Sequence, residues 1–483
     1  MRAEQLPEQR FLRILQVSTS DRAGGAERSA WNLFRAYRER GHASWLAVGY
    51  KRSDDPDVIV VPDRRHLAAW GRLCLDLQAR LKPFHDNVRG MWRVRAWLDT
   101  WASPLGEMAR RLGIEDFNYP GTRHLLKLLP SKPDIIHCHN LHGGYFDLRA
   151  LPWFSRQLPV IVNLRDAWLL SGHCAHSFEC ERWQTGCGRC PDLNIYPAIQ
   201  RDATAYNWRR KRDIFARSRL YVATPSEWLM RKVERSILAP AIVESRVIPN
   251  GVDLSVFHPA DRQKARAALN LPQESKVLLF SANGIRRNEW KDYETMRAAV
   301  ALVADRRHGQ SLLFIALGED APAEQIGQAE VRFVPYQKDP EAVARYYQAA
   351  DVYLHAARVE VWGLTITEAL ACGTPVVVTA VGGIPEQVKG LEMADGGWRM
   401  ANLNRYGASE ATGILVRQRD AEGMALGIER LLNNDPLRRR LGENAARDAH
   451  ERFGLQRQVD SYLKWYGELL ADTNRCVTAS ANL

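Results

Sequence analysis

The sequence predicts an α/β protein with two consecutive domains, each built on a parallel sheet. Apolar, strand-like segments alternate with segments of helical periodicity along almost the whole chain. This alternation is typical of parallel strands joined by helices. A length of 483 residues also exceeds what one ordinary hydrophobic core holds. We therefore expect two doubly wound domains with a cleft between them, in which ligands bind at the carboxyl ends of strands.

The first domain is expected to span residues 11–250. Its opening strand is predicted at 12–18, and an amphipathic helix follows at about 26–40. Its later strands are predicted in apolar segments at 134–139, 160–164 and 220–224. A polar stretch at 259–275 leads into the strands of the second domain, which is expected at 251–452.

The second domain has its first predicted strand at 276–281. Further strands are predicted at 312–317, 331–335, 352–355, 376–379 and 413–416. Helical patterns separate most of them, as expected for a second parallel sheet. The tail at 453–472 has the pattern of one more amphipathic helix.

The composition is that of an ordinary globular protein, with 46% hydrophobic and 25% charged residues. No stretch approaches the ~18 consecutive apolar residues of a membrane-spanning helix. The polar N-terminus lacks the apolar region of a secretory signal. These features predict a cytoplasmic protein, in which eight cysteines are thiols or metal ligands rather than disulfides.

A basic segment at 64–130 interrupts the first domain. It carries twelve Lys and Arg residues against six acidic ones and contributes much of the net charge of +11. Four tryptophans are interleaved with them: Trp70, Trp92, Trp97 and Trp101. Basic and aromatic residues on helix-like segments suit an anionic membrane surface. Nucleic acid and a merely solvated basic face are the alternatives.

Two glutamates flank a predicted helix start in the second domain. Glu360 follows the strand at 352–355, and Glu368 lies inside the helix that opens near Gly363. A helix N-terminus has free N–H groups and a partial positive charge that suit a phosphate. Carboxylates on either side could hold sugar hydroxyls, although solvated glutamates on a plain strand–helix–strand unit are the alternative.

This segment resembles the donor-site signature of family 4 glycosyltransferases, in which two glutamates separated by seven residues surround a Gly-Leu pair. The resemblance covers nearly the whole chain, except the first ten residues and the basic segment, and implies the GT-B fold. In that fold the last helix commonly crosses back to the first domain, which we expect of the tail at 453–472. It places Glu360 near the donor sugar and Glu368 at the nucleotide ribose. The N–H groups of Gly363 and Leu364 would face the phosphate, and Trp362 replaces the more usual Phe.

Two further loops match phosphate-binding positions of the same family. Gly24 and Gly25 follow the first strand, where glycine lets the backbone approach a phosphate or acceptor closely. In the second domain, the family clamps the diphosphate with an Arg and a Lys, and Arg286 and Lys291 have the usual spacing. Arg287 competes with Arg286 for this role. A fixed positive pair stabilises a departing diphosphate without a catalytic metal.

Polar residues after first-domain strands form the predicted acceptor side. His139 and His142 follow the strand at 134–139, and histidine can hydrogen bond to a sugar hydroxyl or relay a proton. The resemblance favours His139, with His142 second, while a structural histidine is the alternative. Asp166 follows the next strand and is a candidate acceptor-side carboxylate.

A cysteine-rich insertion is expected at 172–192. It contains four cysteines in the pattern Cys-x5-Cys-x6-Cys-x2-Cys: Cys174, Cys180, Cys187 and Cys190. Four thiolates at such spacing in a cytosolic chain suit one tetrahedral structural zinc, with His173 or His176 able to replace a ligand. Reduced cysteines packing a loop and an iron–sulfur cluster are the alternatives. A similar insertion occurs in a bacterial polysaccharide subset of family 4 enzymes.

The resemblance thus implies a retaining glycosyltransferase that moves a sugar from a nucleoside diphosphate to an acceptor hydroxyl. The resemblance places it in exopolysaccharide, capsule or O-antigen assembly, on a glycan or lipid-linked acceptor at the inner face of the membrane. No cofactor is expected for catalysis, and nucleic acid is not an expected partner. A basic zinc-containing nucleic-acid-binding protein and a GT-B sugar-nucleotide epimerase are the alternatives. The sequence does not name the donor base, the sugar or the acceptor.

Overall fold

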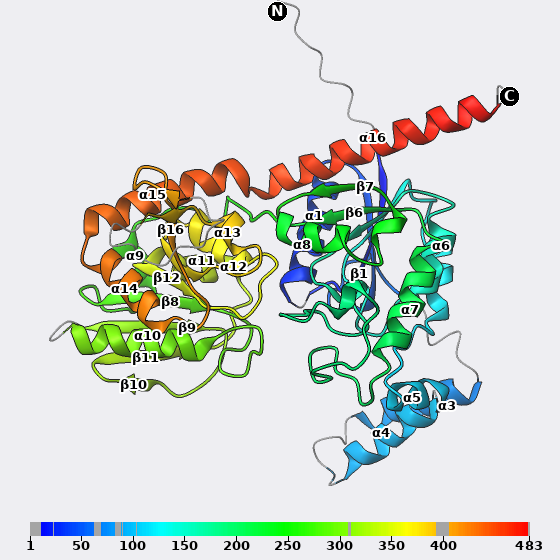
Figure 1. The fold of residues 1–483 in the computed structure, drawn as a ribbon, viewed down its shortest axis with the longest axis horizontal. Coiled ribbons are helices and arrows are strands. Elements are labelled where there is room, and N and C mark those ends of the chain that lie inside the picture. The colour runs from blue at the N-terminus through cyan, green and yellow to red at the C-terminus, as the bar shows by residue number, and fades with distance from the viewer. Residues whose placement is uncertain are drawn as a thin grey trace, which may run out of the picture. The chain divides into compact units, whose positions relative to one another are not determined.

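The computed structural model describes residues 11–22, 24–61, 69–82, 88, 90–102, 104–307, 311–392 and 405–481. The described part of the chain forms two compact units (Figure 1). The first unit takes its residues from the segments Met1–Thr224, Met230–Arg246 and Leu463–Leu483. The second takes its residues from Pro225–Leu229 and Val247–Tyr462.

The first unit is built on one sheet with the strand order β3-β2-β1-β4-β5-β6-β7. Its strands are β1 (Arg13–Ser20), β2 (Ala43–Tyr50), β3 (Val58–Val60), β4 (Ile135–Cys138), β5 (Val160–Asn163), β6 (Leu220–Thr224) and β7 (Ile242–Val247). Pairing is parallel from β3 through β6. The chain adds strands outward on one side of β1 and then on the other side from β4. The order therefore reverses between β1 and β4, where doubly wound sheets bind ligands.

The helices of the first unit lie in the connections between its strands, and three of them gather in a group of their own. The helices are α1 (Gly25–Glu39), α3 (Ala69–Arg80), α4 (Met91–Ala102), α5 (Pro104–Arg111), α6 (Leu151–Phe154), α7 (Thr204–Phe215) and α8 (Glu227–Glu234), of which α8 begins in the segment Pro225–Leu229 of the second unit. In α1 an acidic residue lies in the first turn and a basic one in the last, which complements the helix dipole. Figure 1 shows α3, α4 and α5 gathered beyond the lower end of α7.

The second unit has a nine-stranded sheet with the order β10-β11-β9-β8-β12-β13-β16-β14-β15. Its strands are β8 (Lys276–Ser281), β9 (Leu312–Leu317), β10 (Glu324–Ile326), β11 (Ala329–Val334), β12 (Val352–His355), β13 (Val376–Thr379), β14 (Gly390–Leu391), β15 (Arg405–Tyr406) and β16 (Gly413–Val416). The central pairs are parallel, and only β10 runs antiparallel to its neighbour among the described strands. Here the strand order reverses between β8 and β12.

The helices of the second unit cover both faces of this sheet. They are α9 (Arg262–Ala268), α10 (Tyr293–Arg306), α11 (Pro340–Ala349), α12 (Leu364–Ala371), α13 (Ile384–Gln387), α14 (Ala421–Leu432) and α15 (Asp435–Arg452). Aspartates cap four of them: Asp261 caps α9, Asp292 caps α10, Asp339 caps α11 and Asp420 caps α14. Two apolar cores, one on each face, hold the layers together.

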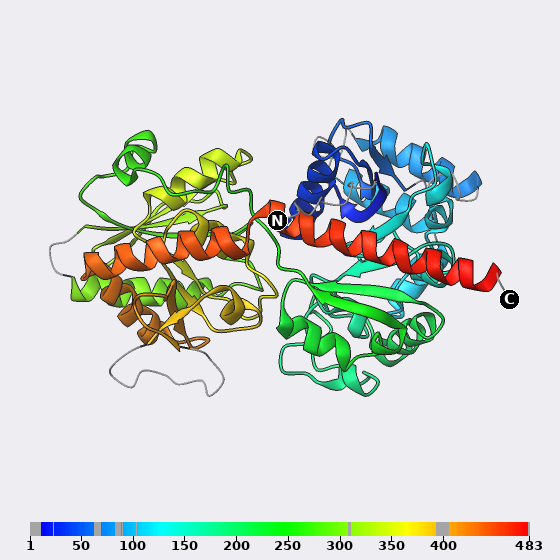
Figure 2. The ribbon, with the colours of Figure 1, turned by 90° about the horizontal axis from the view of Figure 1, so that it is seen from above.

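The last helix, α16 (Leu455–Ala481), packs on the first unit from Leu463 onward. Figure 2 shows its later turns running across that unit. The hydroxyl of Tyr466 lies 3.0 Å from that of Tyr37 on α1 and 2.7 Å from Nδ1 of His137 on β4. All three side chains are fully buried. This polar cluster fixes α16 against both a helix and the sheet.

The fold class predicted from the sequence is confirmed, and most predicted strands lie within two residues of their observed bounds. Six of the described strands are not among those expected: β2, β3, β7, β10, β14 and β15. Of these, β3, β10, β14 and β15 have at most three residues, too few to show a periodic pattern. The C-terminal helix extends beyond its expected end. The basic segment contains α3, α4 and α5, while Arg64, Arg65 and Arg89 lie outside the described residues. No helix in the described part of the chain has the length and apolarity to span a membrane.

Candidate functional site

Three loops of the second unit meet at the carboxyl edge of its sheet. They follow β8, β9 and β12, which are neighbouring parallel strands. The loop after β8 carries Lys291, whose backbone forms an antiparallel bridge with Ala357 just past β12. Lys291 therefore lies beside the point where the strand order reverses, the expected position of a ligand site in a doubly wound domain.

A cationic and an anionic side chain meet there with a histidine. The ammonium of Lys291 forms an ion pair with Oε2 of Glu360 and lies 3.1 Å from Nε2 of His355. The same His355 nitrogen is 3.5 Å from the Glu360 carboxylate. His355 is fully buried, whereas the Lys291 and Glu360 side chains keep 15% and 16% of their surface. The pair is therefore within reach of a ligand.

The charges of this cluster are fixed near neutral pH. Burial would raise the pKa of Glu360, but the Lys291 ammonium brings that pKa well below its usual range. Burial and the Lys291 charge lower the pKa of His355 to about 4. His355 is thus neutral, with Nε2 accepting from Lys291 and Nδ1 3.2 Å from the hydroxyl of Tyr353.

The two candidate arginines lie in the same loop as Lys291 but differ in their contacts. Nε of Arg286 donates to Glu319 at 2.7 Å. Glu319 follows β9 and also accepts the backbone N–H groups of Ile285 and Arg286. Arg287 is exposed, and no ion pair of its side chain occurs among the described residues. Glu319 therefore holds Arg286 in place, and the geometry leaves the choice between the two arginines open.

The start of α12 is partly engaged by the protein itself. The N–H of Gly363, the N-cap residue, donates to the side chain of Gln387 at 2.9 Å. The N–H of Leu364 begins the helix. Trp362 is largely buried, and its ring packs edge-on against Phe453. Glu368 is only 1% exposed and accepts a hydrogen bond from the Tyr347 hydroxyl at 2.9 Å.

The glycine pair of the first unit lies at the start of α1. Gly24 is the N-cap and Gly25 the first helical residue. The turn before them is held by Asp21, whose carboxylate accepts the N–H groups of Arg52 and Ser53 at 2.8 and 2.7 Å. The two glycines, the start of α1 and the turn held by Asp21 thus all follow β1. They lie beside the point where the strand order of this sheet reverses.

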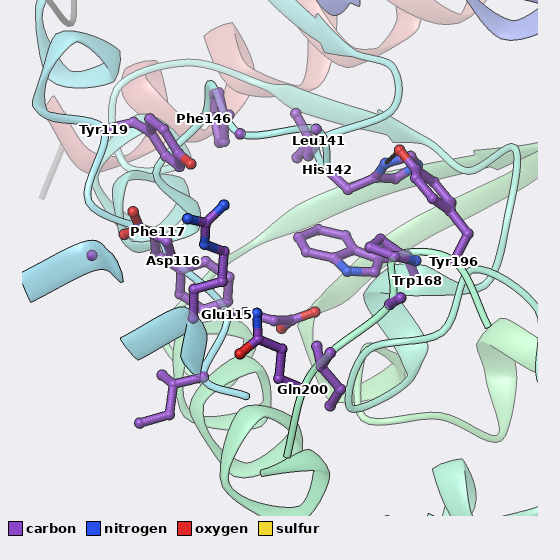
Figure 3. A pocket seen from close by; sticks show the side chains of 18 of the residues that line it. Glu115, Asp116, Phe117, Tyr119, Leu141, His142, Phe146, Trp168, Tyr196 and Gln200 are labelled. Atoms are coloured by element: carbon purple, nitrogen blue, oxygen red, sulfur yellow. Dashed lines mark hydrogen bonds between the residues drawn. The ribbon is translucent and has the colours of Figure 1, made fainter. Parts of the chain in front are cut away.

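A pocket of about 520 Å³ opens in the first unit (Figure 3). Residues after β4 and β5, the end of the cysteine-rich loop and α5 line it. Its aromatic lining consists of Phe117, Tyr119, Phe146, Trp168 and Tyr196, and its charged lining consists of Glu107, Arg110, Glu115 and Asp116. His142 also lines it, next to Tyr196 in Figure 3.

His142 and Asp166 form a dyad at this pocket. Nε2 of His142 lies 2.7 Å from Oδ2 of Asp166, whose other oxygen accepts the N–H of Trp168 at 2.9 Å. Nδ1 of His142 is 3.5 Å from the Tyr196 hydroxyl. Burial would lower the pKa of His142, but the Asp166 carboxylate reverses this effect and leaves the pKa above its ordinary value. The geometry thus brings together the two residues assigned to the acceptor side.

A buried ion pair supports the pocket from behind. The ammonium of Lys211 lies 2.9 Å from the Glu115 carboxylate and donates to the carbonyls of Trp168 and Ser171. It also lies 3.8 Å from the centroid of the Trp168 ring. Burial lowers the pKa of Lys211 and raises that of Glu115. This pair fixes the orientation of the Trp168 wall.

His139 occupies a different environment from His142. It is 1% exposed, stacks on His137 with ring centroids 4.3 Å apart, and hydrogen bonds to the side-chain amide of Gln16. Burial and the charge of Arg165 hold its pKa well below the ordinary value. The structure therefore places His139 inside the unit and His142 at the pocket.

The four cysteines of the insertion are free thiols in one irregular loop. Burial raises the pKa of Cys174 to about 11 and that of Cys187 to about 12, and the neighbouring cysteines contribute. Sγ of Cys187 accepts the N–H of Gly172 at 3.3 Å, and Nε2 of His173 is 3.4 Å from Sγ of Cys190. Nowhere in the described part of the chain do three or more His, Cys, Asp or Glu side chains form a group that could hold a metal ion.

Several residues of these sites were not identified from the sequence. His355 ends a buried strand directly before the loop with Glu360, a position that could have indicated it. Trp168 lies two residues after Asp166 and could have been found in the same way. Glu319 follows β9 and could have been found as a strand-end residue, although its contact with Arg286 is set by the fold. Tyr196 carries no local signal, because only the folded chain brings it to the pocket.

Both halves of the chain match known glycosyltransferase families. Residues 23–256 match the family Glycosyltransferase Family 4, and residues 261–448 match the family Glycosyl transferases group 1. A D-inositol 3-phosphate glycosyltransferase from Thermobispora bispora is 32% identical over 251 residues, which cover 49% of this chain and 53% of that protein. WcaC of Escherichia coli, named as a colanic acid biosynthesis glycosyl transferase, is 26% identical over 51% of this chain and 60% of its own. The chain thus spans little more than half the length of the curated relatives it matches.

Solved structures share the fold. HepE from Anabaena in complex with UDP-glucose has a TM-score of 0.55 at 17% identity, covering 96% of this chain and 100% of that chain. WaaG, a glycosyltransferase involved in lipopolysaccharide biosynthesis, has a TM-score of 0.54 at 17% identity, covering 94% and 99%. These likenesses show the GT-B fold. The chain belongs to glycosyltransferase family 4, as the two family matches over residues 23–256 and 261–448 together show.

Proposed function

We propose that the protein transfers a hexosyl group from a nucleoside diphosphate sugar to an acceptor hydroxyl. The observation that carries this proposal is the position of Lys291, His355 and Glu360 at the reversal of strand order between β8 and β12. An ammonium at that place can stabilise the negative charge that builds on a departing diphosphate. Membership of family 4 supports the same reaction.

Lys291 can reach a phosphate without leaving its partners. An ammonium has three N–H donors, and the described contacts of Lys291 occupy two of them, with Glu360 and His355. The third can donate to a diphosphate oxygen. Arg286 or Arg287 and the N–H of Leu364 at the start of α12 would add further positive potential. This set supplies the charge stabilisation that the reaction requires.

The reaction would proceed with retention of the anomeric configuration. In this scheme the acceptor attacks on the face from which the diphosphate leaves, and the departing phosphate takes the proton of the acceptor hydroxyl. The sugar carbon exchanges its bond to the phosphate oxygen for a bond to the acceptor oxygen. NMR of the product formed from a donor of known configuration tests this, because an inverted linkage would exclude the scheme.

The central test uses two variants with transfer and donor binding measured separately. Lys291→Ala and Glu360→Ala should each lose at least about a hundredfold in transfer from a nucleoside diphosphate sugar, as expected when a charge-stabilising group is removed. Circular dichroism should show that both variants remain folded. Wild-type turnover in both variants would refute the proposal. A thermal-shift panel of UDP, GDP and their sugars would identify the donor.

We further propose that the acceptor is a glycan or a lipid-linked glycan of exopolysaccharide, capsule or O-antigen assembly, reached at the inner face of the membrane. Support comes from the basic segment, in which Trp70 on α3 and Trp92, Trp97 and Trp101 on α4 are exposed. Val94, Trp97 and Trp101 share one face of α4. Exposed aromatics beside arginines match an interface with anionic lipid.

Membrane contact has its own test. Vesicles containing phosphatidylglycerol should bind the protein more tightly than phosphatidylcholine vesicles at low salt, and Trp97→Ala/Trp101→Ala should remove most of this difference. Tyr206→Ala, which truncates an exposed aromatic on α7, is the matched control. Equal binding to both vesicle types would refute the membrane proposal. Tight binding to a polynucleotide instead would favour nucleic acid as the partner of this surface.

We also propose a structural zinc at Cys174, Cys180, Cys187 and Cys190. The thiols share one loop, and Cys187 already accepts a backbone N–H as zinc thiolates commonly do. The described side chains are not arranged as a metal-binding group, so zinc binding would have to draw the sulfurs together. Metal analysis of the purified chain should find about one zinc per molecule. The proposal fails if none is found and added zinc leaves the thermal stability unchanged.

A further inference from the structure

We propose that the pocket lined by Trp168, Tyr196 and His142, here called the Trp168 pocket, binds an uncharged sugar ring of the acceptor and rejects sugars that carry a phosphate or carboxylate. This inference rests on the proposed function and names the acceptor class for it. Every lining residue belongs to the first unit, so the argument needs no assumption about the arrangement of the two units.

The size and walls of the pocket suit a sugar. Its volume of about 520 Å³ lies within the range of small-molecule sites, roughly 300–1,000 Å³. The Trp168 indole forms one wall, and the phenol ring of Tyr196 lies close by (Figure 3). Aromatic rings provide apolar area at low entropic cost and pack against the C–H face of a hexose. Because Lys211 and Glu115 hold the indole from behind, this wall is rigid before any ligand arrives.

The charges of the lining argue against an anionic ligand. Three carboxylates line the pocket, on Glu107, Glu115 and Asp116. Arg110 is the only Lys or Arg among the described lining residues, and its guanidinium is ion-paired with Glu107, which also pairs with Arg111. The His142 ring, whose pKa is raised, is paired with Asp166. Lys211, behind the wall, has its donors taken by Glu115 and two carbonyls. Each of these cationic groups already has a carboxylate partner, so a phosphate or carboxylate entering here would compete with carboxylates of the protein, whereas sugar hydroxyls can donate to them.

The dyad provides a directed hydrogen-bonding group for one sugar hydroxyl. Asp166 takes the N–H at Nε2 of His142, and Nδ1 faces the Tyr196 hydroxyl. Nδ1 accepts from a sugar hydroxyl when the ring is neutral and donates to the hydroxyl oxygen when the ring is protonated, the form that the raised pKa of His142 favours. A sugar hydroxyl serves in either case because it both donates and accepts, and the Tyr196 hydroxyl could join the same network. Hydroxyl groups on an uncharged ring are therefore the chemistry that this pocket recognises.

Pairs of neutral and anionic glycosides test, on the full-length protein, whether the Trp168 pocket prefers uncharged sugars. Saturation-transfer NMR would compare p-nitrophenyl β-D-glucoside with its glucuronide, and the corresponding galactoside with its galacturonide. Each pair differs only in a CH2OH group against a carboxylate, so the aglycone contributes equally. We expect at least one neutral glycoside to bind at least tenfold more tightly than its charged partner. Tighter binding of the uronides, or no binding of either neutral glycoside, would overturn the inference.

Variants locate the binding and change its selectivity. Tyr196→Ala should weaken binding of the neutral glycoside at least threefold, while Trp153→Ala, at an exposed tryptophan outside the pocket, should leave it unchanged. Glu107→Gln releases Arg110 from its ion pair and should narrow the preference against the glucuronide. Unchanged affinity in Tyr196→Ala, or unchanged selectivity in Glu107→Gln, would contradict the assignment of the pocket.

Donor binding measured in parallel separates this inference from the proposed function. If UDP and GDP sugars bind and Lys291→Ala abolishes that binding, the proposed function stands whatever the glycosides do. Loss of glycoside selectivity alone would then overturn only the acceptor inference. Conversely, failure of every nucleotide sugar to bind would refute the proposed function while leaving the glycoside result as a separate measurement of this pocket.

Discussion

Two lysine–glutamate pairs, one in each unit, show how similar chemistry serves different purposes. Lys211 is fully buried, and Glu115 and two backbone carbonyls take its donors. Lys291 keeps part of its surface, and Glu360 and His355 take two of its donors. The first pair is complete within the protein and stabilises the fold, whereas the second leaves one direction open for a ligand. Satisfaction of donors, more than burial or charge, separates a structural ion pair from a candidate functional one.

The largest effect is expected when the buried Lys211–Glu115 ion pair is broken. Lys211→Met should lower the free energy of unfolding by about 3–5 kcal/mol, because Glu115 is left as a buried charge without a partner. Lys211→Met/Glu115→Leu should recover much of this loss, since neither charge then remains buried. Urea unfolding followed by tryptophan fluorescence measures both variants. A loss below about 1 kcal/mol in the single variant would contradict a structural role for this pair.

Breaking the Lys291–Glu360 ion pair should reduce activity more than stability. Lys291→Met should reduce kcat by about 10²–10³-fold, which corresponds to about 2.7–4 kcal/mol of transition-state stabilisation. The free energy of unfolding should fall by less than in Lys211→Met, because the Lys291 and Glu360 side chains keep 15% and 16% of their surface exposed, whereas Lys211 keeps none. Steady-state kinetics with the identified donor and urea unfolding provide the two values. A large stability loss with unchanged kcat would reverse the comparison.

The pH dependence of the free energy of unfolding tests the environment of His355, the neighbour of the Lys291–Glu360 pair. Its pKa is about 4 in the folded protein against an ordinary 6.5, so the unfolded chain binds the proton first. Its contribution to stability is therefore full above pH 6.5 and is lost as the pH falls from 6.5 to about 4, by roughly 3 kcal/mol at most. His355→Gln should show a smaller loss across this window. Equal pH dependence of unfolding in both proteins would exclude this contribution.

The smallest effect is expected at the buried polar cluster of Tyr466, Tyr37 and His137. Tyr466→Phe removes the hydroxyl that contacts Tyr37 and His137. A buried hydrogen-bonding group left without its partner costs about 1–3 kcal/mol, and we expect a loss near 1 kcal/mol because two neutral groups remain. Donor binding should be unaffected. Urea unfolding of Tyr466→Phe beside Tyr336→Phe, a change at an exposed tyrosine of the second unit, isolates the effect.

Local patterns were sufficient for the strands that hold the sites. The apolar run of β12 and the Gly363 helix start predict where Glu360 lies, since both signals are local in the sequence. The spacing of Arg286 and Lys291 likewise indicates one loop. These predictions succeed because the carboxyl ends of parallel strands lie at one edge of a sheet, so residues just after strands are brought to a common place.

Partners across the fold could not be predicted in this way. Nothing near Lys291 in the sequence indicates that His355 accepts from its ammonium, and nothing near Arg286 points to Glu319. For His139 and His142, three residues apart, composition gives no means of deciding which one is buried. The close packing of His139 on His137 and of His142 beside Tyr196 decides it.

By itself the sequence determined the α/β class, the order of most strands and the loops that carry charge, because periodicity and turn residues are properties of neighbouring positions. Tertiary structure alone decided which donors and acceptors are already satisfied. The fold surrounds the Lys211 ammonium with acceptors beside the Trp168 ring, and it leaves one donor of Lys291 available at the edge of the second sheet. The physical reason is that hydrogen bonds between distant segments depend on where folding places them, and no local pattern records those distances.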